Sequence, residues 1–386
     1  GWPEGLEYQT LSLVTPRKGY KKEKLKNLCK FSSGEFLPNT QQQKGNIPVF
    51  GGNGINGFHN KSITKNPTII IGRVGAYCGS IHISKEQCWI TDNAIFINSL
   101  NEEINIDFLF RYLLKININR LAETAAQPKI SQSILRNIVI LYPDVKEQQK
   151  IATILSNVDN LIESTEKVIT HSTKVKKGLM QKLLTRGIGH TKFKKVPWLF
   201  GKEIEIPEEW EVNEIQNHVE VTTGSKNTQD KVQNGKYPFY VRSQKIERID
   251  SFSFDEESVL TAGDGVGTGK VFHYVNEKFD LHQRAYKISN FSKNLNGFYF
   301  FYYFKRNFFA RAMSMNANAS VDSIRMDTIT KMQILIPPLS EQQKISSILS
   351  NIDSKITSQE QYKEKLEKLK KSLMQKLLTG EVRVWV

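Results

Sequence analysis

The chain has few cysteines and no long apolar run. Its 386 residues include 3 cysteines, Cys29, Cys78 and Cys88, an odd number without the C-x-x-C spacing of zinc sites or redox motifs. We therefore expect ordinary thiols in a reducing cytoplasm, with no disulfide framework. The longest apolar stretches, residues 68–72 and 298–304, are far shorter than the roughly 18 residues of a membrane-spanning helix. We expect a cytoplasmic protein without a membrane anchor.

Motifs of catalytic sites are also lacking. The 7 histidines show no H-E-x-x-H or other metal-ligand spacing. The segment GDGVGTGK, residues 263–270, fails as a phosphate loop because Asp264 stands at a glycine position and Val271 replaces the required Ser or Thr. No E-x-K pair of a metal nuclease follows Pro143 and Asp144. We therefore expect no catalytic centre, no metal and no cofactor in this chain.

Acidic residues are in the minority. The sequence has 54 Lys and Arg against 39 Asp and Glu, a formal net charge of +15 with a pI of about 9.4. Lysines gather in residues 18–30, 192–195 and 363–376. A polyanion is the natural partner, although charge alone does not distinguish DNA from RNA or from an acidic protein.

The chain contains an internal duplication. Residues 147–185 recur as residues 341–379, with 23 of 39 positions identical and no gap. The repetition extends more faintly into the preceding segments, where Gly34 and Gly45 align with Gly224 and Gly235 at an offset of 190. A period of this size means two domain-sized halves rather than a solenoid. The loops between these anchors differ, which indicates one scaffold with two recognition surfaces. Plain drift after duplication is the alternative.

The hydrophobic pattern predicts the fold class. Short apolar runs separated by Gly, Asn and Pro precede each repeat and predict strands, interrupted by short helices at residues 106–116 and 296–309. We expect an α/β (α+β) protein with two globular domains related by duplication. The expected boundaries are residues 1–146 for the first globular domain, 147–186 for a central helix, 187–340 for a linker and the second globular domain, and 341–386 for a C-terminal helix.

Each repeat predicts a long helix with one buried stripe. Apolar residues recur at steps of three, four and seven, as in a coiled-coil seam. At 1.5 Å per residue each helix is about 55–60 Å long. A two-fold relation between the halves predicts that the helices pack antiparallel and separate the globular domains; folding back of each helix on its own domain is the alternative. The expected seam is Ile151, Ile154, Val158, Leu161, Val168, Val175, Leu179, Ile345, Ile348, Ile352, Tyr362, Leu366, Leu369 and Leu373.

Polar residues suited to reading base edges lie in glycine-rich or turn-rich segments. Asn and Gln can bond adenine bidentately, and Arg can do the same to guanine. The clusters at residues 91–93 and 282–284 occupy matching positions of the two halves, although any single residue could instead stabilise its own loop. The candidates for DNA contact are Asn53, Asn56, His59, Arg73, Tyr77, Thr91, Asp92 and Asn93 in the first half, and Arg242, Gln244, Lys270, His282, Gln283, Arg284 and Asn318 in the second.

These features together resemble the specificity subunit of a type I restriction-modification system. The motifs that carry the resemblance are PPLSEQQKI at residues 337–345, LMQKLLT at 373–379, IPEEW at 206–210, GRVGAYCG at 72–79 and TAGDGVGTGK at 261–270. The resemblance covers essentially the whole chain. Residues 1–19 have no IPEEW counterpart.

The resemblance implies that the two globular domains are target-recognition domains for a bipartite, asymmetric sequence of double-stranded DNA. It also implies that the long helices dock modification (methyltransferase) subunits, two in number, and that restriction or translocase subunits join the complex. Catalysis, with S-adenosylmethionine, ATP and Mg, then belongs to those partner subunits. The expected partner-contact residues are the repeated glutamines Gln148, Gln149, Gln181, Gln342, Gln343 and Gln375.

Two other functions fit the composition. A coiled-coil scaffold that holds nucleic acid without sequence preference would share the basic charge and the helices. A nuclease or methylase would need a metal or methyl-donor site, and the sequence contains no motif for either. Divergent loops beside constant helices favour the specificity subunit over both.

The helix repeat generates a prediction about spacing. Inserting four helix-forming residues between Lys167 and Thr173, with a matching insertion between Gln361 and Lys365, lengthens both helices by about 6 Å. At about 3.4 Å per base pair, the gap between half-sites should grow by about one or two base pairs. The methylation motif of cells carrying the variant measures this gap. A gap of unchanged length would show that the helices do not set it.

Overall fold

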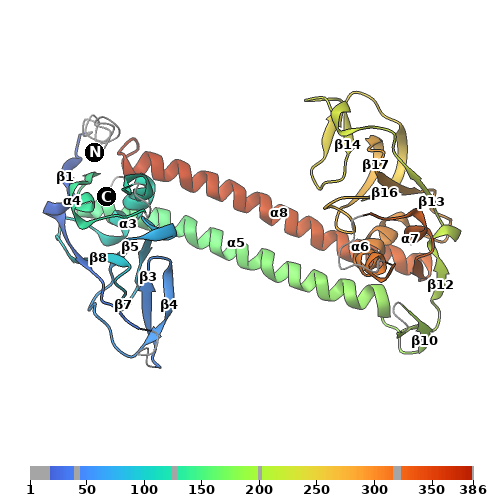
Figure 1. Ribbon diagram of the computed structural model, residues 1–386, viewed down its shortest axis with the longest axis horizontal. Helices are drawn as coiled ribbons and strands as arrows, with labels where there is room; N and C mark the ends of the chain where they lie inside the picture. Colours follow the sequence, from blue (N-terminus) through green and yellow to red (C-terminus); the bar gives the residue numbers. More distant parts are fainter. Residues whose placement is uncertain (1–17, 39–43, 124–127, 199–201, 316–322, 385–386) are drawn as a thin grey trace. The chain divides into compact units, whose positions relative to one another are not determined.

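The structure, a computed structural model, describes residues 18–38, 44–123, 128–198, 202–315 and 323–384. It divides into two compact units, one formed by the chain up to Glu166 with Gln361–Val386, the other by Lys167–Glu360. Each unit contains one mixed α/β domain and part of the long helices α5 (Val145–Arg186) and α8 (Leu339–Leu378) (Figure 1). The predicted fold class is confirmed, and both helices begin two residues before the predicted start.

The first unit holds a mixed set of small sheets. A four-stranded antiparallel sheet has the order β2-β8-β5-β6, and a three-stranded sheet has the order β4-β3-β7 with β3 and β7 parallel. Strands β1 and β9 form a separate antiparallel pair. The bounds are β1 Lys21–Lys24, α2 Leu25–Leu28, β2 Cys29–Ser33, β3 Ile47–Gly51, β4 Gly54–His59, β5 Ile69–Gly72, η2 Gly75–Tyr77, β6 Ile81–Ile83, β7 Trp89–Ile90, β8 Ala94–Leu100, α3 Ile106–Ile116, η3 Ile118–Leu121, α4 Gln132–Asn137 and β9 Val139–Tyr142.

The second unit repeats this plan around one larger sheet. Its six strands have the order β13-β18-β16-β17-β14-β15, again with one parallel pair, β14 and β17. Strand β10 pairs with β11, and β12 pairs with β19. The bounds are β10 Phe193–Pro197, β11 Glu203–Pro207, β12 Glu211–Glu214, η5 Ile215–Asn217, β13 Glu220–Thr223, η6 Thr228–Asp230, β14 Tyr237–Tyr240, β15 Glu247–Ile249, β16 Phe254–Ala262, β17 Phe272–Leu281, β18 Ala285–Ser289, α6 Gly297–Met315, α7 Met326–Thr330 and β19 Gln333–Ile336.

The glycines shared by the two halves are places where backbones approach closely. A β-carbon on Gly34 would lie 2.1 Å from the carbonyl oxygen of Thr91, and one on Gly224 would lie 2.0 Å from that of Leu281. No side chain fits at such distances, so both positions require glycine. The weak sequence similarity before the helices therefore reflects a backbone fold that is present twice. In this fold the strand pair β1 and β9 corresponds to the pair β12 and β19.

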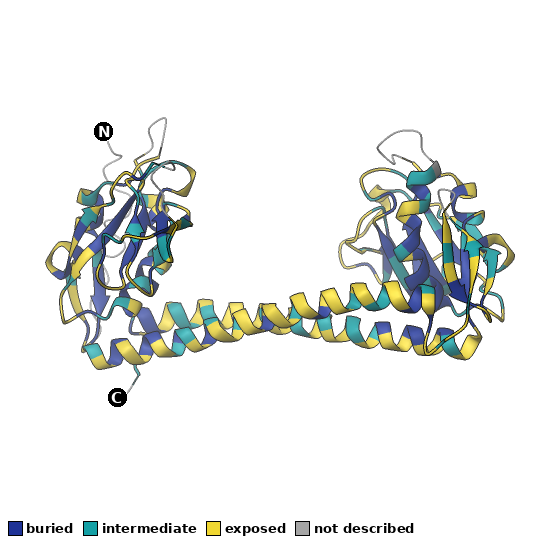
Figure 2. Ribbon diagram, turned by 90° about the horizontal axis from the view of Figure 1, so that it is seen from below, coloured by how far each residue is buried: buried dark blue, intermediate teal, exposed yellow. Residues whose placement is uncertain are grey.

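Each domain is held together by a buried apolar cluster. In the first unit the strand β5 is buried along its whole length, as a strand with both faces covered must be. In the second unit the helix α6 contributes a row of aromatic side chains that are 0% exposed, including Tyr299, Tyr303 and Phe308. The helix predicted at residues 106–116 is confirmed as α3, and the one predicted at 296–309 continues to Met315 as α6. In Figure 2 the strands of each domain are mostly buried, whereas much of the surface of the long helices α5 and α8 is exposed.

The segments of α5 and α8 that share a unit run antiparallel. In the first unit Asp159 of α5 is paired with Lys370 of α8 at 2.6 Å, and Glu166 with Lys363 at 3.1 Å. In the second unit Lys176 pairs with Asp353. Positions along α5 rise as positions along α8 fall, so the predicted antiparallel pairing is confirmed within each unit. The outer turns also pack into the domain cores, where Ile151 and Leu183 are buried.

The buried stripe of each helix differs in part from the predicted seam. It advances by alternating steps of three and four residues, and none of its members is exposed: Ile151, Leu155, Val158, Ile162, Thr165, Ile169, Ser172, Lys176, Leu179 and Leu183 in α5, and Ile345, Leu349, Ile352, Ile356, Gln359, Lys363, Leu366, Lys370, Leu373 and Leu377 in α8. The prediction was wrong for Leu161, Val168, Val175, Ile348, Tyr362 and Leu369, which are 36–47% exposed. Each of these apolar residues comes one position before a residue of the stripe in the sequence. The stripe itself contains polar residues, which a search for apolar periodicity does not detect.

The first glutamine of each helix motif joins the helix to its domain. Gln148 is 0% exposed; its amide nitrogen donates to the carbonyl oxygens of Glu103 and Pro143, and its amide oxygen accepts from the backbone of Asn105 at 2.8 Å. Gln342 makes the equivalent three bonds in the second unit and is also 0% exposed. The prediction that these two glutamines contact a partner is therefore corrected, because their polar atoms are satisfied inside the fold.

The described residues contain no helix long and apolar enough to cross a membrane. Cys29, Cys78 and Cys88 are all buried and free.

The buried glutamines generate a stability prediction. Replacing Gln148 by Ala removes three hydrogen bonds and leaves buried backbone groups unpaired, which should lower the free energy of unfolding by about 1–3 kcal/mol or more. The neighbouring change Gln149→Ala is the matched control, because Gln149 is exposed and such changes usually stay within about 0.5 kcal/mol. Urea unfolding of both variants measures the difference. Equal effects would contradict the structural role of Gln148.

Candidate nucleic-acid interface

Three segments of the first unit converge beside the end of β3. They are the β3–β4 turn, the loop after β5 and the turn after β7. The backbone of Arg73 donates to the carbonyl oxygen of Asn93 at 2.9 Å. A β-carbon on Gly52 would lie 3.5 Å from that same oxygen and 3.5 Å from the Cα of Gly72. Loops that carry residues predicted to read DNA therefore meet at one place, although those residues lie up to 40 positions apart in the sequence (53 to 93).

Most of the predicted residues of the first half face solvent. Asn53, Asn56, Tyr77, Asp92 and Asn93 are exposed, while Arg73 and Thr91 are partly exposed.

Two residues of the first half are corrected. His59 is 4% exposed, and its ring lies edge-on to Trp89 at 5.3 Å between ring centroids, so it belongs to the domain interior. The hydroxyl oxygen of Thr91 is buried as well, so this side chain does not present its polar atom to DNA.

The second unit brings together the corresponding three segments. The Asp264 carboxylate accepts from the guanidinium of Arg242 at 2.7 Å and from that of Arg284 at 3.0 Å. The amide of Gln244 donates to the carbonyl oxygen of Lys270 at 3.3 Å. Burial alone would raise the pKa of Asp264, but the hydrogen bonds from Arg242 and Arg284 hold it below its usual value.

The predicted residues of the second half have mixed outcomes. Gln244, Lys270, Gln283 and Arg284 are exposed, and Arg242 is partly exposed. His282 is corrected, since it is 4% exposed and its Nδ1 accepts from the backbone of Arg284 at 3.0 Å. Burial lowers the pKa of His282, and the nearby charge of Arg242 lowers it further. Asn318 lies outside the described residues.

The predicted equivalence of residues 91–93 and 282–284 is borne out by the backbone. Ala94 donates its N–H to the carbonyl oxygen of Thr91 at 3.0 Å, and Ala285 donates to that of His282 at 2.9 Å. Both clusters therefore form the same turn on the same frame with different side chains.

The glycine-rich segment forms a loop that both halves share. Gly75 and Gly79 have φ of 74° and 80°, and Gly265 and Gly269 have φ of 77° and 68°. A positive φ is the conformation that glycine adopts without strain. These glycines are therefore required by the turn, and a phosphate site is not needed to explain them. Val266, at the tip of the loop in the second unit, is 96% exposed.

Sequence reasoning missed a pair of equivalent histidines. The Nε2 of His82 lies 3.3 Å from the carbonyl oxygen of Gly52, and that of His273 lies 3.1 Å from the carbonyl oxygen of Ser243. Burial lowers the pKa of His273. The two histidines align at an offset of 191, so a full alignment of the halves would have found them.

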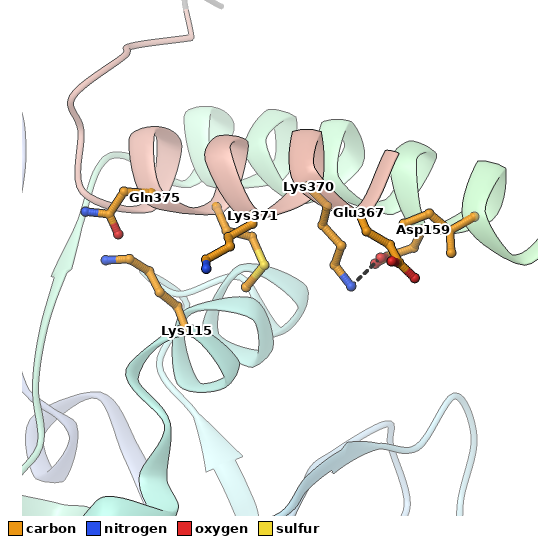
Figure 3. Close-up of a pocket in the computed structure, with 8 residues that line it drawn as sticks. Lys115, Asp159, Glu367, Lys370, Lys371 and Gln375 are labelled. Atoms are coloured by element: carbon orange, nitrogen blue, oxygen red, sulfur yellow. Dashed lines mark ion pairs between the residues drawn. The ribbon is translucent and has the colours of Figure 1, made fainter. Parts of the chain in front are cut away.

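The remaining partner-contact candidates lie on the helices. Gln149, Gln181, Gln343 and Gln375 are all exposed. Gln181 and Gln375 occupy equivalent positions of the repeat, and each lines a cavity, of about 480 and 620 Å³ respectively. Figure 3 shows Lys115 of α3 extending toward Gln375 and Lys371 of α8, whereas Lys370 is paired with Asp159.

Within the described ranges, no group of three or more His, Cys, Asp or Glu side chains is arranged to hold a metal ion.

Comparison with known proteins places the chain among specificity subunits. The family model of the type I restriction modification DNA specificity domain matches twice, at residues 17–171 and 207–368. The type I restriction enzyme MjaVIII specificity subunit of Methanocaldococcus jannaschii is 30% identical over 365 residues, which cover 84% of this chain and 81% of the relative. The EcoprrI specificity subunit of Escherichia coli is 31% identical over 165 residues, covering 42% of this chain and 41% of the relative.

Solved structures agree on the fold. The S subunit of a type I restriction-modification system from M. genitalium superposes with a TM-score of 0.71 at 16% identity, covering 95% of this chain and 98% of that one. The two matches to the family model correspond to the two duplicated halves, each with its domain and part of the long helix that follows. The chain therefore belongs to the type I restriction-modification DNA specificity family.

Proposed function

We propose that this chain recognises the DNA target of a type I restriction-modification complex. Each recognition domain binds one half of a bipartite, asymmetric target in double-stranded DNA, and the long helices dock the modification subunits. The observation that carries the proposal is the pair of equivalent turns at residues 91–93 and 282–284, which share a backbone and differ in every side chain. A duplicated frame with two different sets of base-reading groups suits a target whose halves differ.

The charge supports binding to DNA. A net charge of +15 attracts the phosphate backbone and supplies affinity without sequence preference. The alternative scaffold that holds nucleic acid nonspecifically would need this charge, but it would not need two different sets of polar loop residues on one surface of each domain.

Exposed apolar residues on the long helices support partner docking. Leu161, Tyr362 and Leu369 in the first unit, and Val168 and Val175 in the second, precede the buried stripe by one position and are 38–47% exposed. Apolar side chains at such a repeat suit a further helix packed alongside. A solved structure with a TM-score of 0.50 at 14% identity belongs to work on complex assembly of the type I system.

Catalysis belongs to the partner subunits in this proposal. Two modification subunits carry S-adenosylmethionine, and restriction or translocase subunits carry ATP and Mg. This chain itself performs no reaction and acts in the cytoplasm, where the DNA and those subunits are found.

The decisive experiment is to map adenine methylation across the genome with and without this chain. A bipartite motif that appears only in its presence is the expected result. Methylation of single, undivided sites, or no change, would contradict the proposal.

The divided recognition surface generates a prediction for the first half-site. Replacing Asp92 and Asn93 by Ala removes exposed base-reading groups, and each lost contact should cost about 1–3 kcal/mol of discrimination. The first half of the methylation motif should relax while the second half stays unchanged. Glu102→Ala, another exposed acidic residue of the same unit, serves as the control. Equal loss of binding to all sequences would assign these residues to phosphate contact or to folding.

The proposed division of labour generates a second prediction. The purified chain should neither methylate nor cut DNA, and its DNA affinity should fall steeply with salt because of its positive charge. Methylation should appear when modification subunits are added. Metal-dependent cleavage by the chain alone, abolished by Asp144→Asn or Asp264→Asn, would overturn the assignment.

A further inference from the structure

Asp264 gathers two arginines from separate segments onto one carboxylate. One of its oxygens accepts from Arg242, in the segment after β14, and the other accepts from Arg284, in the turn after β17. The side chain of Asp264 is 22% exposed, against 38% for Arg242 and 62% for Arg284. The acid therefore lies beneath the two guanidinium groups, which remain the outermost part of the cluster.

The glycines beside Asp264 make this arrangement possible. A β-carbon on Gly263 would lie 2.9 Å from the carbonyl oxygen of Arg284, and one on Gly267 would lie 2.3 Å from that of Arg242. Because both positions lack a side chain, the loop approaches the backbones of both arginines and places Asp264 between them. The glycine-rich loop is thus a clamp for two arginines.

The bonding pattern leaves the arginines free to donate further. An arginine has five N–H donors in a planar fork, and the bond to Asp264 uses one Nη1 donor of each. Each carboxylate oxygen of Asp264 already accepts a hydrogen bond from one arginine, so the carboxylate is oriented by the two arginines. Two cations and one anion leave the cluster with a net positive charge, which suits the acceptor-rich edge of guanine.

The first unit has no such clamp. The strand bridge between Asp264 and Ser323 corresponds to the bridge between Val74 and Lys129, so valine occupies the position of Asp264. Arg284 corresponds to Asn93 at the offset of 191 that relates the halves, and Arg242 corresponds to a glycine, Gly51 or Gly52, at the offset of 191 or 190. Any reading chemistry that depends on the clamp is therefore confined to the second half-site.

We propose that Asp264 is a positioning residue that holds Arg242 and Arg284 for the recognition of guanine in the second half-site. Each guanidinium donates bidentately to O6 and N7 of a guanine in the major groove. Asp264 contacts no base and acts by limiting the conformations of the two side chains before DNA arrives. This inference rests on the proposed function, since it specifies the base that one recognition domain reads.

The effect of Asp264→Asn on DNA affinity distinguishes a positioning role from a role in neutralising the positive charge of the two arginines. Removing a negative charge from a DNA-facing surface should strengthen binding to every sequence, because the phosphates are attracted more strongly. If Asp264 positions the arginines, Asp264→Asn has the opposite effect on the specific target. Specific binding weakens while nonspecific binding stays the same or becomes stronger.

The experiment uses the full chain assembled with its modification subunits and a duplex that carries the mapped methylation motif. Binding is measured for the wild type and for Asp264→Asn, with guanine or 7-deazaguanine, which lacks the N7 acceptor, in the second half-site. We expect 7-deazaguanine to weaken wild-type binding about 10-fold or more, in line with the loss of a bidentate contact. Asp264→Asn should lose a similar factor on the natural duplex and little more on the modified one.

Matched variants complete the test. Glu277→Gln makes the same acid-to-amide change at another exposed position of the second unit and should leave the preference for guanine intact. Arg242→Lys and Arg284→Lys keep the charge but lose the planar fork, so they should reproduce the loss of guanine preference even where Asp264→Asn fails to fold. Base changes in the first half-site should affect wild type and variants equally.

The outcomes that overturn the inference differ from those that overturn the proposed function. A wild-type complex that binds a bipartite motif without any guanine in the second half-site, or that ignores 7-deazaguanine, refutes the guanine clamp alone. Full guanine preference in Asp264→Asn refutes it as well. A wild-type complex without any bipartite preference refutes the proposed function itself.

Discussion

The glutamate and glutamine that open each long helix are the contacts on which the rest of the structure depends. The buried glutamine ties the first turn to the domain that precedes it. The adjacent glutamate holds the segment that follows the other helix: Glu147 binds the guanidinium of Arg383, at 2.6 Å in its shortest contact, and Glu341 accepts from the backbone of Ile188 at 2.7 Å and from the indole of Trp210 at 3.0 Å. Each helix is thereby fixed to its domain and to its partner at the same place, and the duplicated sequence EQQKI encodes both contacts.

The register of the paired helices is specified by polar contacts within the buried stripe. Lys370 and Lys176 occupy equivalent stripe positions, and each pairs with an aspartate, Asp159 or Asp353, that is equivalent in the repeat. A lysine in a coiled-coil core lowers stability but favours the one register in which its charge is paired. The duplication thus placed the same register-setting pair in each unit. Apolar side chains fill most of the stripe and supply its burial, while these ion pairs favour one alignment of the two helices.

The loops proposed to contact DNA are structurally independent of the helices and of the contacts that fix them. The loops that carry the candidate base-reading groups are held by backbone hydrogen bonds and by close approaches at glycines, which do not constrain the identity of the side chains between them. The first unit presents an arginine with asparagines, whereas the second gathers two arginines on one carboxylate. Side chains in these loops can therefore change without disturbing the backbone that holds them.

The sequence alone determined the duplication, both long helices, the helix α3, the main strands and the matching positions of residues 91–93 and 282–284, because periodicity and glycine placement are local signals. Only the tertiary structure decided which polar residues face solvent. His59, His282, Gln148 and Gln342 are buried, since the burial of a polar group depends on partners far away in the sequence. Asp264 was read as a defect in a phosphate motif, yet it is the centre of an arginine cluster, because its two partners lie 20 and 22 residues away and meet it only in the fold.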